Sequence, residues 1–163
     1  MSPHHPPFAP ELPLNTRFTL GAHTFTEDEI LAFARAYDPQ PFHIDAEAAK
    51  RSHFGGLVAS GWHTAAMWMR YSVAWHAARR AEVEARGQGL PARGPGLGFK
   101  DLRWLKPVYV GDTITFHGEI RERRPSKGQP GWSVVTAYNS ATNQHGDLVL
   151  DFTISALQAL REG

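Results

Sequence analysis

SGWHTAAMWMRYSVAWHAARR, residues 60–80, predicts the longest helix in the chain. Ser60 suits the N-cap position, because its hydroxyl can accept a hydrogen bond from a free amide of the first turn. From Gly61 to about Arg80, apolar residues occupy most of the helix circumference, and a helix with this pattern is usually buried on most sides. We therefore expect this helix at the centre of the fold. Its apolar residues are Ala65, Ala66, Met67, Trp68, Met69, Val73, Ala74 and Trp75.

The sequence after this helix changes from helical to strand periodicity. Residues 87–98 hold five glycines and two prolines and predict a flexible surface loop. Beyond this loop, apolar and polar residues alternate as they do in half-buried antiparallel strands. The strand-like runs, separated by turn residues, are residues 99–108, 113–123, 132–143 and 147–160.

The sequence before the helix predicts one strand and a first short helix. Residues 17–25 alternate loosely between apolar and polar and predict a strand with a turn at Gly21. Thr26 and Glu29 have the spacing of a capping box, in which each side chain can bond the backbone amide of the other residue. The helix that begins there should end at Asp38, because a proline follows.

These elements together predict the fold class. Asp45 can cap another short helix over residues 46–51. The economical packing lays the long helix across one curved antiparallel sheet of about five strands. This α+β plan is the hotdog arrangement. At 163 residues the chain suits one domain, which we place at residues 15–163. Residues 1–14 hold five prolines and no apolar run, and predict a flexible arm.

Composition limits the partners and the compartment. The formal net charge is +1, which gives no general attraction to nucleic acid. No apolar run reaches the roughly 20 residues that a membrane-spanning helix needs, so we expect no membrane insertion. The chain has no cysteine, which is compatible with the reducing cytoplasm where we place the protein. The histidines lack the spacings typical of metal sites, so we expect no bound metal.

A candidate for catalysis lies between the two short helices. Asp38 and His43 are five residues apart and carry side chains well suited to exchange protons with a reacting water. Pro39 and Pro41 lie between them and fix the backbone φ angle at two positions, which stiffens the loop. Taken alone, this spacing is more typical of a turn residue and a surface imidazole.

Three segments, in order along the chain, resemble the MaoC-like dehydratases and (R)-specific enoyl-CoA hydratases. DPQPFH at residues 38–43 resembles their hydratase motif, with Gln40 where the family usually has Asn. FGGLVASG at residues 54–61 resembles the entry to their central helix. KPVYVGDT at residues 106–113 resembles their Pro-to-Gly-Asp connection. The resemblance implies a hotdog enzyme, and it runs from about residue 18 to the C-terminus.

The resemblance also implies roles for individual residues. Asp38 and His43 would hold one water between them, one removing its proton while the other protonates the substrate α-carbon. The backbone amide of Gly61, in the first turn of the long helix, would stabilise the enolate that forms on the thioester oxygen. The alternative for Gly61 is that it merely allows close packing of the helix on the sheet.

The remaining expectations concern the substrate. Gln40, Ser60 and Trp62 are expected to bind it, and SGW at residues 60–62 replaces the His-Gly-Met common in the family. The resemblance implies an acyl-CoA thioester as substrate, a homodimer, and acid-base chemistry without metal or redox cofactor, coenzyme A being part of the substrate. Acyl chain length and the thioester carrier, coenzyme A or acyl carrier protein, stay open.

Two other functions also stay open. A hotdog acyl-CoA thioesterase would hydrolyse the thioester with an acid or base on the central helix, but residues 61–80 contain no Asp or Glu. A non-catalytic acyl-CoA binding protein would have no need of a water-activating pair. The leading expectation is therefore an enoyl-CoA hydratase, equivalently a 3-hydroxyacyl-CoA dehydratase.

Overall fold

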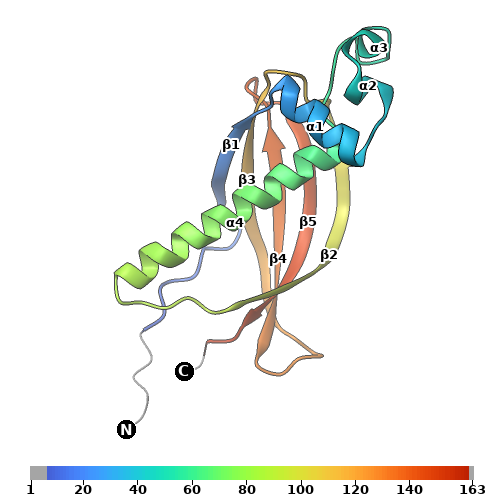
Figure 1. Cartoon of the computed structure of the whole chain (residues 1–163). Helices are drawn as coiled ribbons and strands as arrows, with labels where there is room; N and C mark the ends of the chain where they lie inside the picture. Colours follow the sequence, from blue (N-terminus) through green and yellow to red (C-terminus); the bar gives the residue numbers. More distant parts are fainter. Residues whose placement is uncertain (1–6, 162–163) are drawn as a thin grey trace.

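A curved antiparallel sheet carries one long helix across its concave face (Figure 1). The computed structural model describes residues 7–161. The predicted hotdog arrangement, of the α+β class, is confirmed. In chain order the elements are β1 (Arg17–Thr24), α1 (Glu27–Tyr37), α2 (Pro41–Ile44), α3 (Ala46–Lys50), α4 (Gly61–Ala85), β2 (Arg93–Trp104), β3 (Thr113–Pro125), β4 (Trp132–Thr142) and β5 (Leu148–Ala159).

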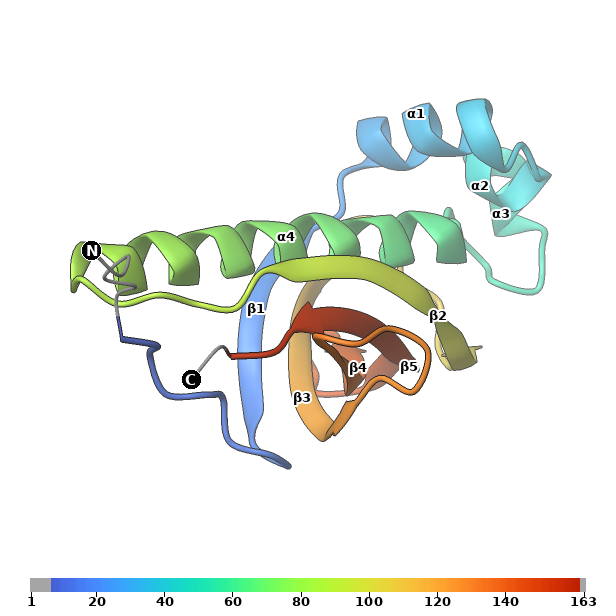
Figure 2. The ribbon, with the colours of Figure 1, turned by 90° about the horizontal axis from the view of Figure 1, so that it is seen from below.

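The sheet has five strands in the order β1-β3-β4-β5-β2. Every neighbouring pair is antiparallel, so β1 and β2 form the two edges. Seen from below, the sheet curls beneath α4, and the edge strand β2 runs close to the helix (Figure 2). Helices α1, α2 and α3 gather near the first turns of α4, at one end of the sheet (Figure 1).

The densest core lies between the sheet and the N-terminal half of α4. Ile114 and Phe116 of β3 have no exposed surface, at positions where the alternation turns apolar side chains toward the helix. Trp68 of α4 enters this core with its ring edge on Phe152, 4.5 Å between ring centroids. Its indole N–H donates to Asn139 Oδ1 at 3.1 Å, which satisfies a polar group that burial would otherwise leave unpaired.

Local signals set the helices that precede α4. Thr26 Oγ1 accepts from the Glu29 amide at 3.4 Å, as the capping box predicts, and α1 ends at Tyr37. Asp45 caps α3 by accepting from two amides of its first turn. The four-residue helix α2 was not predicted, although Pro41 stands at its first position, where a missing backbone N–H costs nothing.

Half of the stretch predicted as a flexible surface loop is part of the sheet. β2 begins at Arg93 and pairs with β5, so residues 93–98 are strand. An added Cβ at Gly94 would meet the Trp132 ring at 2.7 Å and Leu157 Cβ at 2.9 Å. Glycine here permits a close approach between strands, and composition alone does not distinguish that role from a loop.

The turn predicted at Gly21 is a strand irregularity instead. The register between β1 and β3 shifts between Thr19 and Gly21, and β1 continues to Thr24. Gly21 has a φ of +151°, and the ring of Tyr71 on α4 occupies the space that a Cβ would need. A glycine at this position therefore lets β1 pass directly beneath the helix.

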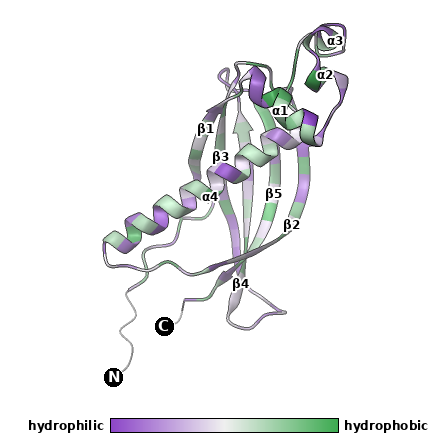
Figure 3. Cartoon of the chain, viewed as in Figure 1, coloured by the Kyte–Doolittle hydropathy of each residue, from purple (hydrophilic) through white to green (hydrophobic). Residues whose placement is uncertain are grey.

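Helix α4 is exposed along one side, which corrects the prediction that it is buried on most sides. The side chains of Met69 and Val73 are 43% and 59% exposed. A single sheet covers only one side of a helix, and α1 adds cover only near the start of α4, where Phe33 stacks on His63. Figure 3 shows hydrophilic and hydrophobic residues mixed along α4.

The described part of the predicted flexible arm, residues 7–14, packs against the rest of the protein. Residues 1–6 lie outside the described residues, but Ala9 is buried and its amide donates to Gly89 O at 2.9 Å. Arg161 and Arg123 donate to the carbonyls of Ala9 and Leu12 at 2.6 and 2.8 Å. Because these arginines come from distant parts of the sequence, the composition of the arm does not reveal its docking.

Replacing Gly21 by Ala should destabilise the fold. The new methyl group would collide with the Tyr71 ring at a φ that side chains rarely adopt, so we expect a loss of about 1–3 kcal/mol in the free energy of unfolding. Urea denaturation measures it. Gly128→Ala is the matched control, because a Cβ there meets no atom within 4 Å. Equal stability of the two variants would contradict the packing argument.

Candidate active site

Asp38, in the loop between α1 and α2, and His43, on α2, lie beside the N-terminus of α4. Asp38 is the C-cap of α1, and its backbone amide donates to Ala34 O at 2.8 Å. The Gln40 amide then donates to Asp38 O at 2.8 Å, and the His43 amide donates to Gln40 O at 2.9 Å. Pro39 and Pro41 restrict the same turn, so backbone bonds and prolines together fix the loop.

The side chains of Asp38 and His43 face each other. His43 Nε2 lies 3.4 Å from Asp38 Oδ2. His43 is 6% exposed, and its Nδ1 lies 2.7 Å from the carbonyl oxygen of Val58. Since that oxygen can only accept, Nδ1 carries a hydrogen and donates it. In the neutral imidazole the lone pair is then on Nε2, directed toward Asp38.

Two side chains hold the Asp38 carboxylate. Gln40 Nε2 donates to Oδ1 at 2.8 Å, and Ser60 Oγ donates to Oδ2 at 2.6 Å. Burial acts to raise the pKa of Asp38, but the hydrogen bonds from Ser60 and Gln40 and the charge of His43 outweigh it. The pKa of Asp38 therefore lies below its ordinary value. The carboxylate is ionised at neutral pH.

Ser60 does not line the pocket, as a substrate-binding residue would. It was expected to bind substrate, but it is 1% exposed and is not part of the pocket lining. Its hydroxyl accepts from the Trp62 amide at 3.3 Å as the N-cap of α4, and donates to Asp38. Ser60 thus orients Asp38 and joins the loop to the helix.

Gly61 begins α4 and lines the same pocket. Within residues 7–161 its amide donates to no protein acceptor, as expected of a first-turn N–H. An added Cβ would lie 2.5 Å from the Trp104 indole. Close packing therefore accounts for the glycine, and the free amide at a helix N-terminus is in addition available to a developing negative charge.

The pocket at this site has a volume of about 490 Å³. Asp38, Gln40, His43, Gly61 and Trp62, all predicted site residues, line it together. The Trp62 ring is 58% exposed and meets the Trp104 ring edge to face, 4.9 Å between centroids. The other lining residues include Phe42, Phe54, Val58, Leu105, Lys106, Val108 and Val149. A polar pair thus stands at one side of a largely apolar pocket.

Comparison with known proteins identifies the family. Residues 9–144 match the family model described as MaoC like domain. The chain belongs to the MaoC-like dehydratase family. It is 36% identical to a MaoC-like dehydratase from Rhodospirillum rubrum, whose crystal structure superposes with a TM-score of 0.75 over 93% of this chain and 96% of that chain.

Two further relatives carry functional names. The 3-hydroxyacyl-[acyl-carrier-protein] dehydratase FERN, mitochondrial, of Solanum lycopersicum is 24% identical over 139 residues, which are 83% of this chain and 72% of that protein. The R-hydratase PhaJ1 from Pseudomonas aeruginosa, solved unliganded, is 24% identical, with a TM-score of 0.65 over 93% of this chain and 84% of that chain. The second likeness shows the fold alone. The MaoC-like family includes dehydratases and hydratases.

Sequence reasoning missed two contributors to this MaoC-like site. The carbonyl of Val58 sets the His43 tautomer, and Trp104 shapes the pocket beside Gly61. Lys106 lines the pocket, whereas Arg103 is engaged by Asp151 at 2.6 Å. None of these has a local sequence signal, because each depends on chain segments brought together by the fold.

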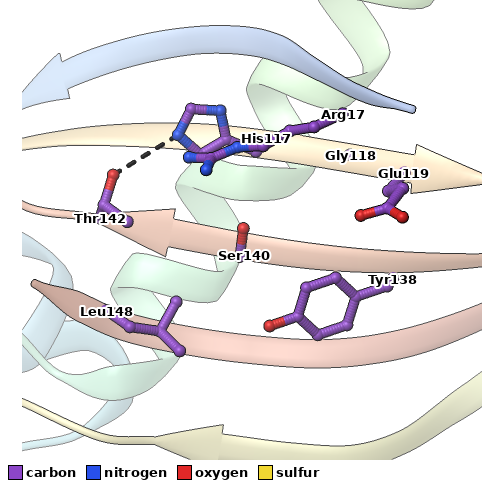
Figure 4. Close-up of a pocket in the computed structure, with 8 residues that line it drawn as sticks. All are labelled: Arg17, His117, Gly118, Glu119, Tyr138, Ser140, Thr142 and Leu148. Atoms are coloured by element: carbon purple, nitrogen blue, oxygen red, sulfur yellow. Dashed lines mark hydrogen bonds between the residues drawn. The ribbon is translucent and has the colours of Figure 1, made fainter. Parts of the chain in front are cut away.

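A smaller pocket lies on the other side of the sheet from α4 (Figure 4). Its volume is about 210 Å³, and the imidazole of His117 lines it. The ring nitrogens of His117 lie 3.4 Å from the hydroxyls of Thr19 and Thr142, and Glu119 pairs with Arg121 at 3.2 Å. These polar groups satisfy one another's hydrogen-bonding capacity. This pocket is therefore a weaker candidate for an active site than the pocket of Asp38 and His43.

A metal site and a membrane-spanning helix are both absent from the described residues. Among residues 7–161, no group of three or more His, Cys, Asp and Glu side chains is placed to hold a metal ion. In the same part of the chain, no helix has the length and apolar character needed to cross a membrane. The expectation of a reaction without a cofactor stays a prediction.

Ser60→Ala should raise the pKa of Asp38. The substitution removes one of the two hydrogen bonds that favour the ionised carboxylate, so the midpoint should move to higher pH. NMR titration of the Asp38 carboxyl carbon measures it. Thr26→Ala is the control, since it also removes a helix N-cap but has no contact with Asp38. An unchanged Asp38 titration in Ser60→Ala would refute the orienting role.

Proposed function

We propose that this protein is an (R)-specific enoyl-CoA hydratase, equivalently a 3-hydroxyacyl-CoA dehydratase. The observation that carries the proposal is the facing pair of His43 Nε2 and Asp38 Oδ2, 3.4 Å apart, beside the free amide of Gly61 in one pocket. Membership of the MaoC-like family and the names of the tomato dehydratase and the Pseudomonas hydratase support it.

The pair is suited to hold and activate one water. Asp38 is ionised and can accept one hydrogen of the water, and the Nε2 lone pair of His43 can accept the other. The two acceptors are held by Ser60, Gln40 and the Val58 carbonyl, so little reorganisation is needed when the water binds. Asp38 also stabilises the imidazolium that forms when His43 takes a proton.

The proton balance needs only this one water. His43 Nε2 removes a proton as the water oxygen bonds to the substrate β-carbon, and the electron pair of the double bond moves toward the thioester carbonyl. The resulting enolate collapses when the imidazolium returns the same proton to the α-carbon. The product is a 3-hydroxyacyl thioester, both catalytic side chains are regenerated, and the reverse sequence is dehydration. We propose that no metal or redox cofactor takes part.

The Gly61 amide is the proposed donor to the enolate oxygen. It stands at the N-terminus of a 25-residue helix, where unpaired amides and the helix dipole favour negative charge. Donors aimed at developing charge commonly contribute about 3–4 kcal/mol. A thioester oxygen at this amide would place the acyl double bond beside Asp38 and His43, because all three groups line the pocket.

The substrate carrier is proposed from the pocket rim. Trp62 is exposed at the mouth, and Gln40 and Lys106 line it. The Lys106 ammonium pairs with Asp147 at 3.0 Å but is 53% exposed, so a phosphate of coenzyme A can compete for it. We propose an acyl-CoA substrate in the cytoplasm, with acyl carrier protein as the alternative donor of the same thioester.

The proposed oligomer is a homodimer formed through β2. This strand is an edge of the sheet, and it leaves Leu97, Phe99 and Trp104 54%, 55% and 45% exposed. Unpaired edge strands with large apolar side chains are strong sites of association. Trp62 of α4 meets Trp104 and is itself exposed, which extends the apolar surface from the sheet to the helix.

Turnover of crotonyl-CoA tests the proposed reaction. Loss of enoyl-thioester absorbance without thiol release is expected from the wild type. Asp38→Asn and His43→Ala should each lower kcat by about 100-fold or more, because the first removes the negative charge that stabilises the imidazolium and the second removes the proton acceptor. Asp45→Asn is the control, since it lies near the same loop but outside the pocket and only caps α3.

The same assay separates the rival functions. Release of free coenzyme A would identify a thioesterase. Saturable binding of crotonyl-CoA without turnover would identify a binding protein, and either result would overturn the proposal. Near wild-type kcat in His43→Ala would reject His43 as the proton carrier even if hydration occurs.

Leu97→Glu should dissociate the proposed dimer. A charge on the apolar surface of β2 must lose its hydration when two copies meet, so the dissociation constant should rise at least about tenfold. Light scattering across a concentration series measures it. Leu14→Glu, at a similarly exposed leucine of the arm, is the matched control. Two variants with the same mass profile as wild type would argue against association through β2.

A further inference from the structure

A second cavity, which we call the distal cavity, lies beneath the C-terminal half of α4. The later turns of α4, which line it, extend away from helices α1, α2 and α3 (Figure 1). Its volume is about 790 Å³, and sites for small molecules are commonly about 300–1,000 Å³. All five strands contribute to its walls. It shares no lining residue with the pocket of Asp38 and His43.

The walls of the distal cavity are mainly apolar. Ile120 and Val135 face it from the sheet, and Trp68 closes the end nearest the densest core. Met69 and Val73 line it from α4 while remaining 43% and 59% exposed, so the cavity is open to solvent on that side. An apolar chain placed there would be shielded from water over much of its length.

The lining of the distal cavity carries a strong excess of positive charge. Five arginines line it, and Glu11 is its one acid. Glu11 faces two of them, with Arg161 at 3.4 Å and Arg123 at 3.8 Å, so one carboxylate serves two guanidinium groups. We call the five the arginine rim; they are Arg79, Arg80, Arg93, Arg123 and Arg161.

Arg79, Arg80 and Arg93 form the part of the arginine rim that Glu11 does not reach, and Arg79 donates to the carbonyl of Pro10 at 3.0 Å. Arg93 is exposed as a whole residue, and within residues 7–161 its guanidinium has neither a hydrogen bond nor an ion pair. Arg80 donates to the carbonyls of Leu90 and Pro91 at 3.3 and 3.0 Å, and lies 3.6 Å from Glu84. Burial and then the charge of Arg80 lower the pKa of Arg93, so the two cations are close enough to repel.

His76 leaves the positive charge of the cavity lining unchanged. It lines the distal cavity beside Arg93 and Arg79. Burial, followed by the charges of these two arginines, lowers the pKa of His76 to about 3, so the imidazole is neutral at physiological pH. The cavity therefore combines an apolar interior with a pair of cations that an anion would relieve.

We propose that the distal cavity binds a single-chain fatty-acid carboxylate, with the alkyl chain in the apolar interior and the carboxylate on Arg93 and Arg80. Guanidinium groups match a carboxylate in geometry as well as in charge. The chain would occupy the space beneath Trp68 and Val73. This binding goes beyond the proposed hydratase reaction and does not depend on it, because the two pockets have no residue in common.

Calorimetric titration of the full-length protein with decanoate tests the proposal. We expect one decanoate per chain, and binding about tenfold weaker for octanoate, which lacks two methylenes. Decan-1-ol and decyltrimethylammonium should bind at least about tenfold more weakly than decanoate, because neither satisfies the free guanidinium. Equal affinity for decanoate and decan-1-ol would show that the arginine rim has no role and would overturn the proposal.

Variants locate the bound chain. Arg93→Ala should weaken decanoate binding at least about tenfold, and Arg93→Glu should abolish it. Ala137→Phe, which places a ring inside the distal cavity, should abolish it as well. Arg51→Ala is the matched control, because it removes an exposed arginine outside the cavity.

Asp38→Asn separates this site from the proposed active site, and it should bind decanoate like wild type. If Ala137→Phe fails to fold by circular dichroism, the two Arg93 variants decide the outcome. Unchanged decanoate binding in Arg93→Glu would refute the proposal. Loss of binding in Asp38→Asn would assign the ligand to the other pocket and refute it equally.

Discussion

The hydrogen bond from Ser60 to Asp38 is the interaction on which the candidate site depends. Ser60 is the N-cap of α4, so the same hydroxyl caps the N-terminus of the central helix and donates a hydrogen bond to the Asp38 carboxylate. Gln40 holds the other carboxylate oxygen from within the loop. The position of Asp38 is thereby tied to the helix end that carries the Gly61 amide, where the dipole favours negative charge. A reaction that develops negative charge next to an activated water needs this arrangement.

Much of the fold follows from signals that are local in sequence. Thr26 and Asp45 cap their helices with their own neighbours, and the alternation along β3 needs only the sheet's period of two. The start of α4 at Gly61 was predicted for the same reason. Asp38 and His43 were found because their spacing lies within one motif, and Gln40 keeps the amide that the motif requires.

The features that were mispredicted depend on contacts between distant segments. Gly94 lies in a strand because Trp132 and Leu157 pass close to it, and its glycine-rich neighbourhood carries no sign of that. The arm docks on Arg123 and Arg161, more than a hundred residues away in the sequence. Ser60 was predicted to bind substrate, but its hydroxyl donates to Asp38, which lies in another segment of the chain. Such errors are expected wherever a side chain's role is set by its tertiary neighbour.

A single sheet under a long helix has a further consequence. The sheet can fill the space beneath α4 only where large side chains face it, and these gather near the first turns, from Phe25 and Ile114 to Trp68. Beyond Trp68 the helix continues for 17 residues to Ala85, and the strands below it leave the distal cavity. The packed half supports the loop of Asp38 in the candidate site, where geometry must be held closely. The hollow half carries no such constraint, and its arginine rim gives that space a charge preference that packing alone would not produce.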